Sequence, residues 1–328
     1  MGHINNYSIL SDSSKADNSS YSGSEVDYTA EKATLFTILP CLSLMIIGVN
    51  SFVLYLMFTR RSLRTATNVC LASLSCSDLL AGACAIPLVI VCTIQKTDSI
   101  CLAMDLFGRF QGVSTVLHLL VISLERYITI VKRFKIDGVI RVKSIIKVLC
   151  IIWLFSLTLI LIQLAWVSFP VYEMSRKNIK ALEMYITCLV GLVAVCLLVI
   201  LFVHGSVFYT LKRQIRHIMR QTPRAELTKS SRKRRNKEFR AIVILSAMII
   251  TFTAGWCGYF LVSIKQDIQI PKLLDYAIFF ARYLTALANP LLYTFFKLDF
   301  RESAMAVFHK FKSDRLLQRD RSSRAVSI

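Results

Sequence analysis

The amino-acid sequence predicts an all-α membrane protein: a seven-transmembrane helix bundle that ends in a short amphipathic eighth helix. Of its 328 residues, 55% are hydrophobic and 18% are charged, which is too apolar for an ordinary soluble domain. A helix needs about 20 apolar residues to cross a bilayer, and the sequence holds seven such runs. Because these runs are continuous and do not alternate, they indicate helices and not the strands of a transmembrane barrel.

The seven expected spans divide the chain into segments. They cover residues 33–58, 69–94, 101–131, 145–169, 184–211, 241–264 and 273–296. Residues 1–32 are polar and lack the short apolar core of a cleavable signal peptide, so the first span is expected to direct its own insertion. We expect a membrane domain over residues 33–299, the amphipathic helix over 300–312 and a tail over 313–328.

Basic residues indicate which ends of the spans face the cytoplasm. Lysines and arginines gather between spans one and two, between three and four, in the long loop 212–240, and after the last span. The positive-inside rule therefore predicts a cytoplasmic C-terminus and an extracellular N-terminus. Asn6 and Asn18 support an extracellular N-terminus, because both lie in acceptor sequences for N-glycosylation. The net charge of +20 then indicates topology together with attraction to membrane lipids with anionic headgroups, with contact to a partner as the alternative, and nucleic-acid binding is not indicated.

Charged residues inside the spans are candidates for functional sites, because an unpaired charge in the bilayer is costly. Asp78 lies in the middle of span two, where it predicts either an ion or proton site or a carboxyl group satisfied by neighbouring helices. Arg126 lies near the inner end of span three, where its side chain could simply extend to the membrane surface, or Glu238, just before span six, could pair with it in one of two states.

The outer half of the bundle holds a second group of charged residues. Asp105 and Arg109 are four residues apart on one helix, which favours an ion pair between them. Arg282 lies deeper, and it indicates either an internal partner or an anionic group of a ligand. Asp275 lies near the outer end of span seven.

The motifs on the spans together resemble those of the rhodopsin-like (class A) G-protein-coupled receptor family. They are Gly48-Val49-Asn50, Leu74 to Asp78, Cys101, Glu125-Arg126-Tyr127, Trp153, Tyr209, Phe252 to Tyr259, Asn289-Pro290-Leu291-Leu292-Tyr293, and Phe300-Arg301. Each motif is weak alone, but together they stand in register, with Phe300-Arg301 at the start of the amphipathic helix and all the others on the expected spans. The resemblance implies a plasma-membrane receptor that activates a heterotrimeric G protein and is not an enzyme.

The resemblance also implies roles for individual residues. A sodium ion, the one cofactor expected, would be held by Asp78, Asn50, Thr115 and Asn289. G-protein coupling and switching would involve Glu125, Arg126, Tyr127, Tyr209, Glu238, Asn289, Pro290 and Tyr293. An extracellular ligand would bind among Asp105, Arg109, Gly112, Trp256, Tyr259, Phe260, Ser263, Asp275, Phe279, Arg282 and Tyr283, with Trp256 as a toggle at the base.

Three departures from the family pattern leave alternatives open. Leu201 and Gly258 stand where members usually have proline, which puts a bulge in span five and a kink in span six in doubt. The usual disulfide would join Cys101 to a cysteine in the loop after span four, but that loop has none. Cys188 and Cys92 are the remaining candidate partners, and a free thiol is the third possibility.

The ligand class stays open at this stage. Gly108 stands where amine receptors of the family carry an aspartate, and Tyr283 stands where opsins carry the retinal lysine. Amine-like, nucleoside-like or lipid-like, and small-peptide ligands remain alternatives. A transporter or channel is the alternative function, although the sequence shows no internal repeats. Arrestin and receptor kinases are further expected partners, through Ser313, Ser322, Ser323 or Ser327 in the tail.

Overall fold

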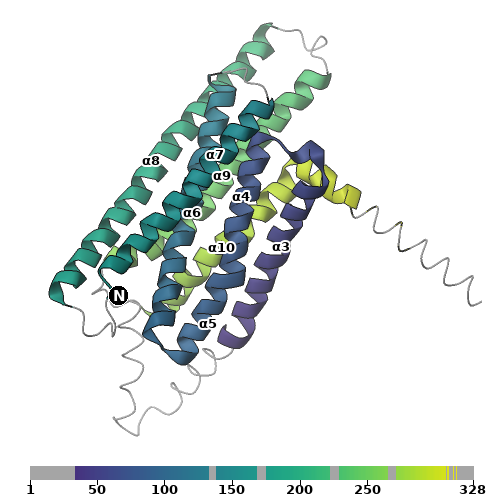
Figure 1. Ribbon diagram of the computed structural model, residues 1–328. Coiled ribbons are helices and arrows are strands. Elements are labelled where there is room, and N and C mark those ends of the chain that lie inside the picture. Colours follow the sequence, from purple (N-terminus) through teal and green to yellow (C-terminus); the bar gives the residue numbers. More distant parts are fainter. Residues whose placement is uncertain are drawn as a thin grey trace, which may run out of the picture.

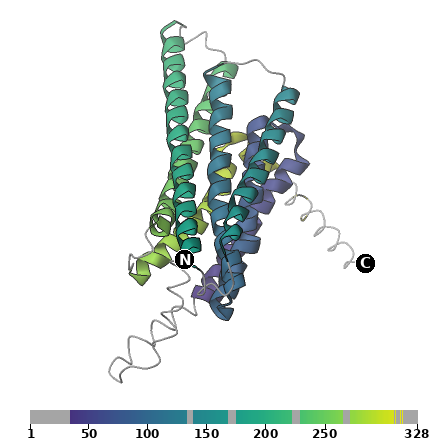
Figure 2. The same ribbon diagram turned by 60° about the vertical axis from the view of Figure 1, so that its left-hand side comes forward.

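The computed structural model describes residues 34–132, 138–167, 175–221, 229–264 and 271–307, together with residues 309, 313 and 315. Within these ranges the long elements are all helices, and they run side by side as an elongated bundle (Figure 1). The view turned by 60° shows the same arrangement from a second side (Figure 2). The fold is therefore the all-helical bundle that the sequence predicts.

The helices follow the order of the predicted spans. The first span is a π-helical turn, η1 (Thr34–Ile38), and α3 (Leu39–Thr59); the second is α4 (Ala66–Leu80), η3 (Ala81–Ala85) and α5 (Ile86–Gln95). A short 3-10 turn, η2 (Arg61–Leu63), joins these two spans. The remaining spans are α6 (Asp98–Ile130), α7 (Gly138–Leu161) with η4 (Ile162–Ala165), α8 (Arg176–Gln221), α9 (Lys229–Ile264) and α10 (Lys272–Phe296).

Six of these segments are long and apolar enough to cross a membrane by length and composition alone, within the described residues. The seventh helix, α10, is 25 residues long and packs mainly against α9, and buried polar residues such as Asn289 lower its hydropathy. The helices of the fourth, fifth and sixth spans depart from the predicted limits: α7, α8 and α9 all begin earlier and α8 also ends later, whereas the fourth span ends earlier, at Ala165 of η4. A hydropathy pattern detects the lipid-facing part of a helix and not its continuation into water.

α6 lies at the centre of the bundle. Its span is 67% buried, whereas that of α7 is 22% buried, so α7 faces mostly outward. α6 contacts α4, α5, α7, α8 and α9, and the main apolar core forms around its buried side. Residues along α6 can therefore contact neighbouring helices at the outer end, the middle and the inner end of the bundle.

Local sequence features explain how several helices begin and end. Pro87 occupies the first turn of α5, directly after the π-helical turn η3, and α5 ends at Lys96 in the left-handed conformation with φ of 50°. A disulfide joins Cys92 of α5 to Cys101 of α6 across this short connection. Of the two partners left open for Cys101 the structure therefore uses Cys92, and Cys188 is an exposed free thiol.

The fifth and sixth spans are unbroken helices at the two positions where family members usually have proline. α8 is continuous through Leu201 and α9 is continuous through Gly258. Gly258 instead allows a close approach, because a Cβ atom there would lie 2.8 Å from Cγ1 of Ile278 on α10. After α10 the chain bends at Lys297, and residues 298–307 form a helix that turns away from the bundle axis (Figure 1, yellow). Its inner face buries Phe300 and Ala304, whereas Arg301 and Glu302 are exposed.

Candidate functional site

The outer half of the bundle is organised around the guanidinium group of Arg282. This residue is only 8% exposed and lies on α10 among four aromatic rings. Its guanidinium carbon lies 4.7 Å from the ring centres of Tyr259 and Tyr283, 5.4 Å from that of Phe279 and 5.7 Å from that of Trp256. Nη2 donates a hydrogen bond to the Tyr283 hydroxyl over 3.0 Å. Cation–π contacts of this kind stabilise a desolvated arginine.

Asp105 and Arg109 form the predicted pair on α6. Nη2 of Arg109 lies 2.6 Å from Oδ2 of Asp105, and Nη1 donates to Oε1 of Gln163 over 2.5 Å. Gln163 lies in η4 and is fully buried, so it holds Arg109 in a fixed position. The sequence analysis missed Gln163, since a lone glutamine near the end of an apolar span carries no distinctive pattern.

Trp256 forms the floor of this outer cluster. Its indole N–H donates to the Thr285 hydroxyl over 3.3 Å, and its ring packs against those of Phe252, Tyr259 and Phe260. A Cβ atom on Gly112 would lie 2.6 Å from the Trp256 ring, so the ring rests directly on the α6 backbone. Trp256 is therefore positioned by both α6 and α10.

The structure thus brings together most of the predicted ligand-binding residues. Ser263 donates its hydroxyl to the Tyr259 carbonyl within α9, so that hydroxyl is engaged in its own helix. The side chain of Asp275 lies outside the described residues. Thr285 was not predicted, although its position one turn after Arg282 on the same face of α10 could have indicated it.

Asp78 lies in the middle of the bundle and is 1% exposed. Its carboxylate accepts one hydrogen bond from Asn289 over 3.0 Å and another from Gln111 over 3.1 Å. Asn50 donates instead to the carbonyls of Ile46 and Ala286. Gln111, one turn before Thr115 on α6, thus joins the side chains at Asp78, and the sodium site of Asp78, Asn50, Thr115 and Asn289 stays a prediction.

The amide oxygens around Asp78 are a set of unused acceptors. Oδ1 of Asn50, Oε1 of Gln111 and Oδ1 of Asn289 are buried and have no hydrogen-bond partner. A carboxylate with neutral amide oxygens is the kind of ligand set that a hard cation prefers. These residues supply the oxygen types that a small cation needs, and the amides of Gln111 and Asn289, which now turn their nitrogens toward Asp78, would have to rotate to present their oxygens.

Glu125 and Arg126 form the main charged group near the inner end. Nε of Arg126 donates to Oε2 of Glu125 over 2.8 Å. Thr67 on α4 donates to the same oxygen over 2.7 Å, and Nε of Arg141 lies 3.7 Å from Oε1. The ion pair that the structure gives Arg126 is thus with its neighbour. Its exchange to Glu238, which is half-buried on α9, stays a prediction.

The two tyrosines that were expected to meet on activation lie apart in this structure. Tyr293 is completely buried, hydrogen-bonded to Ser75 and packed on the ring of Phe300. Tyr209 on α8 is 62% exposed. Pro290 lies inside α10 one turn before Tyr293, and Tyr127 packs against Ile130 near the inner end of α6.

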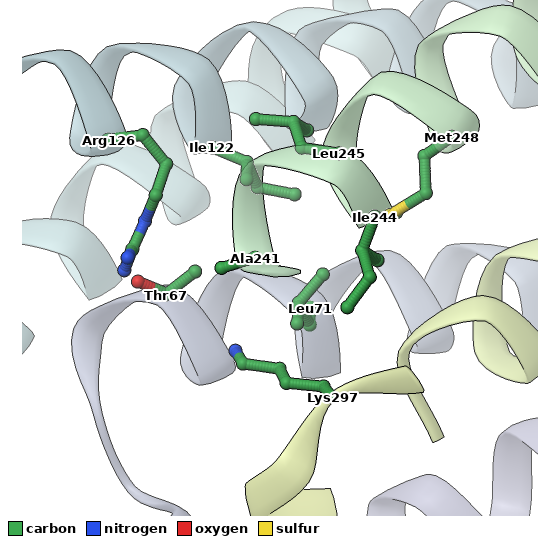
Figure 3. A pocket seen from close by; sticks show the side chains of 9 residues that line it. All are labelled: Thr67, Leu71, Ile122, Arg126, Ala241, Ile244, Leu245, Met248 and Lys297. Atoms are coloured by element: carbon green, nitrogen blue, oxygen red, sulfur yellow. The ribbon is translucent and has the colours of Figure 1, made fainter. Parts of the chain in front are cut away.

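A cavity of about 20 Å³ lies at the inner end, which is enough for a water molecule. Its lining comes from α4, α6, α9 and the residue after α10: Thr67, Leu71, Ile122, Arg126, Ala241, Ile244, Leu245, Met248 and Lys297. Figure 3 shows Arg126 of α6 and Lys297, at the bend after α10, extending toward Thr67. Lys297 is buried and donates to the side-chain oxygen of Asn68. The sequence analysis did not single out Lys297.

Comparison with known proteins identifies the family of this chain. The family model described as 7 transmembrane receptor (rhodopsin family) matches residues 49–293. The chain belongs to this family. The mouse trace amine-associated receptor 1 is 24% identical over 301 residues, which cover 86% of this chain and 90% of the relative. The histamine H2 receptor of Cavia porcellus is 25% identical over 299 residues, covering 86% of this chain and 81% of the relative.

The fold of this rhodopsin-family receptor also matches a solved structure. The crystal structure of squid rhodopsin superimposes with a TM-score of 0.68 at 19% identity, covering 86% of each chain. At this identity the match supports the fold alone. The seven-helix architecture predicted from the sequence is confirmed.

Proposed function

We propose that this chain is a plasma-membrane receptor that binds an extracellular ligand in its outer half and activates a heterotrimeric G protein at its inner end. The observation that carries the proposal is the Glu125–Arg126 ion pair, held by Thr67 beside the inner cavity. A G protein that inserted there would need the cavity to widen. Release of Arg126 would then expose a guanidinium group to the partner.

α9 connects the two ends of the molecule. It carries Trp256 under the outer cluster, and its inner part contributes Ala241, Ile244, Leu245 and Met248 to the cavity wall. A ligand that displaced Trp256 would therefore move the wall of the inner cavity through one rigid helix. Such a ligand would shift a two-state equilibrium only by its differential affinity for the two states.

We further propose that a sodium ion binds at Asp78 and stabilises the inactive arrangement. The three unpartnered amide oxygens of Asn50, Gln111 and Asn289 support this assignment.

Arrestin and receptor kinases would act on the cytoplasmic tail, in agreement with the serines there. The positive-inside pattern supports an extracellular N-terminus.

A ligand-free assay tests the coupling. Glu125→Gln removes the carboxylate that holds Arg126, and we expect it to raise basal G-protein dissociation in cells above that of the wild type. Adding Arg126→Ala should abolish this signal, whereas adding Arg240→Ala, at an exposed arginine of α9, should leave it. Dissociation is read by energy transfer between labelled G-protein subunits at matched surface expression.

The proposal is wrong if Glu125→Gln, expressed at the cell surface, changes the dissociation of no G-protein class. It is also wrong if the signal survives Arg126→Ala.

A further inference from the structure

We propose that the outer cluster recognises a ligand carrying a carboxylate on an apolar body, and that Arg282 binds this carboxylate. The inference rests on the proposed function and names the ligand class of its outer site. It is carried by three observations: the unused donors of Arg282, the absence of side-chain volume beside it at Gly108, and the pairing of Asp105 with another cation.

Arg282 is a buried cation with unused hydrogen-bonding capacity. A guanidinium group has five N–H donors and stays charged in proteins. At Arg282 one donor meets the Tyr283 hydroxyl, and Nε has no partner. The carboxylate of Asp105, on the facing helix α6, forms its ion pair with Arg109. Among the described side chains, the direct contacts of Arg282 are thus with aromatic rings and a neutral hydroxyl, and Asp105 attracts it only at longer range.

The surrounding rings stabilise the charge without satisfying its donors. Tyr259, Phe279, Tyr283 and Trp256 supply π-electron density within 4.7 to 5.7 Å of the guanidinium carbon. Such rings tolerate a cation while offering almost no acceptors for its N–H groups. A carboxylate is the acceptor that fits best, since its two oxygens match two N–H donors of the guanidinium fork.

Gly108 lies beside the guanidinium group on α6. A Cβ atom at this position would lie 3.1 Å from Nη1 of Arg282 and 3.7 Å from the Tyr259 hydroxyl. Amine receptors of this family carry an aspartate here, and its carboxylate would reach Arg282. In this chain that negative charge is absent, and a positive charge occupies the adjacent space. The electrostatic preference is therefore opposite to that of an amine site.

Asp105 does not restore an amine site. Its carboxylate is 2.6 Å from Arg109, which is itself anchored by Gln163. The charges of Asp105 and Arg109 neutralise each other, so the three charged residues Asp105, Arg109 and Arg282 together carry a net charge of +1. A ligand with an anionic group would supply the missing counter-ion, and its apolar body would meet the aromatic rings.

Two matched ligand series test the preference. The full-length receptor, purified in detergent without G protein, is melted with 3-phenylpropionate, 3-phenylpropylamine or 3-phenylpropionamide, and with decanoate, decylamine or decanamide. We expect the carboxylates, and not the amines or amides, to raise the melting temperature. The rise should vanish in Arg282→Gln, partly persist in Arg282→Lys, and remain in Arg176→Gln, which removes an exposed arginine of α8. The two series distinguish aromatic acids from fatty acids.

A second experiment, without ligand, tests the proposal even if the Arg282→Gln variant does not fold. Gly108→Asp should raise the melting temperature above that of Gly108→Asn, because only the carboxylate gives Arg282 an internal counter-ion. The same Gly108→Asp variant should lose its response to the carboxylates. Equal melting temperatures for the two glycine variants would show that Arg282 needs no counter-ion and would overturn the proposal.

Stabilisation by the amines, or stabilisation by carboxylates that persists in Arg282→Gln, would also overturn it. The absence of any Arg282-dependent stabilisation by carboxylates would overturn it whatever the glycine variants do. These measurements involve no G protein, so their failure would leave the coupling proposal intact. Conversely, a receptor that engaged no G protein would still give a valid result here.

Discussion

Three ionisable residues buried in the bundle meet the cost of desolvation in different ways. Asp78 accepts hydrogen bonds from two amides, Arg109 pairs with Asp105, and Arg282 lies among aromatic rings. A lone charge at the bilayer centre costs several kcal/mol, so each arrangement needs a compensating partner. The residues with incomplete compensation, Asp78 and Arg282, are the ones for which we propose exogenous partners.

The Asp78 site makes a prediction at this scale. If sodium binds there, replacing choline chloride by sodium chloride should raise the melting temperature of the purified receptor, because a ligand that binds only the folded state stabilises it. Asp78→Asn should abolish this dependence. Asp105→Asn, which removes a carboxylate already paired with Arg109, should retain it. Equal sodium dependence in the wild type and Asp78→Asn would contradict the assignment.

At the scale of elements, the packing of α9 against α10 determines how Trp256 meets Thr285. Gly255 makes the close approach possible, since a Cβ atom there would lie 2.7 Å from the carbonyl oxygen of Ala281 and 2.5 Å from Cγ2 of Thr285. The first of these atoms belongs to the backbone, so it cannot move aside without moving the helix. Glycine at this position is a packing requirement.

Gly255→Ala should therefore separate α9 from α10 and lower the stability by about 1–3 kcal/mol, as overpacking does. Gly191→Ala is the matched control, because α8 has open space at Gly191 and alanine favours a helix by about 1 kcal/mol. Thermal denaturation in detergent compares the two. Similar melting temperatures for both variants would show that the approach at Gly255 is not limiting.

At the scale of the whole molecule, polar side chains join the helices at the end of the bundle that holds the inner cavity. Arg141 donates to Thr129, Gln214 donates to the carbonyl of Ile130, and Lys297 donates to Asn68, so the ends of α4, α6, α7, α8 and α10 meet there. The inner cavity lies at this end. The positive-inside rule assigns the same end to the cytoplasm.

This orientation predicts that Asn6 and Asn18 carry glycans, although both lie outside the described residues. Endoglycosidase treatment of the expressed receptor should reduce its mass on a gel, and an Asn6→Gln/Asn18→Gln double variant should show no shift. An epitope tag at the N-terminus should be accessible on intact cells, and one at the C-terminus only after permeabilisation. The reverse accessibility would overturn the topology.

The sequence by itself determined the number and order of the spans, and it predicts their orientation. Span length follows from the thickness of the bilayer, and orientation follows from the distribution of lysine and arginine, so both can be read along one dimension. The motifs around Asp78, Arg126, Trp256 and Pro290 were likewise visible as local patterns. The first residues of α7, α8 and α9 and the last residue of α8 were not, because apolar content stops where lipid stops and the helix continues.

Only the tertiary structure decided which helix faces meet. It selected Cys92 as the partner of Cys101, placed Gln111 rather than Asn50 against Asp78, and put Arg282 beside Gly108. Each of these contacts depends on the rotation and tilt of two helices relative to each other. Those quantities arise from side-chain packing summed over the whole interface, and no single span contains them.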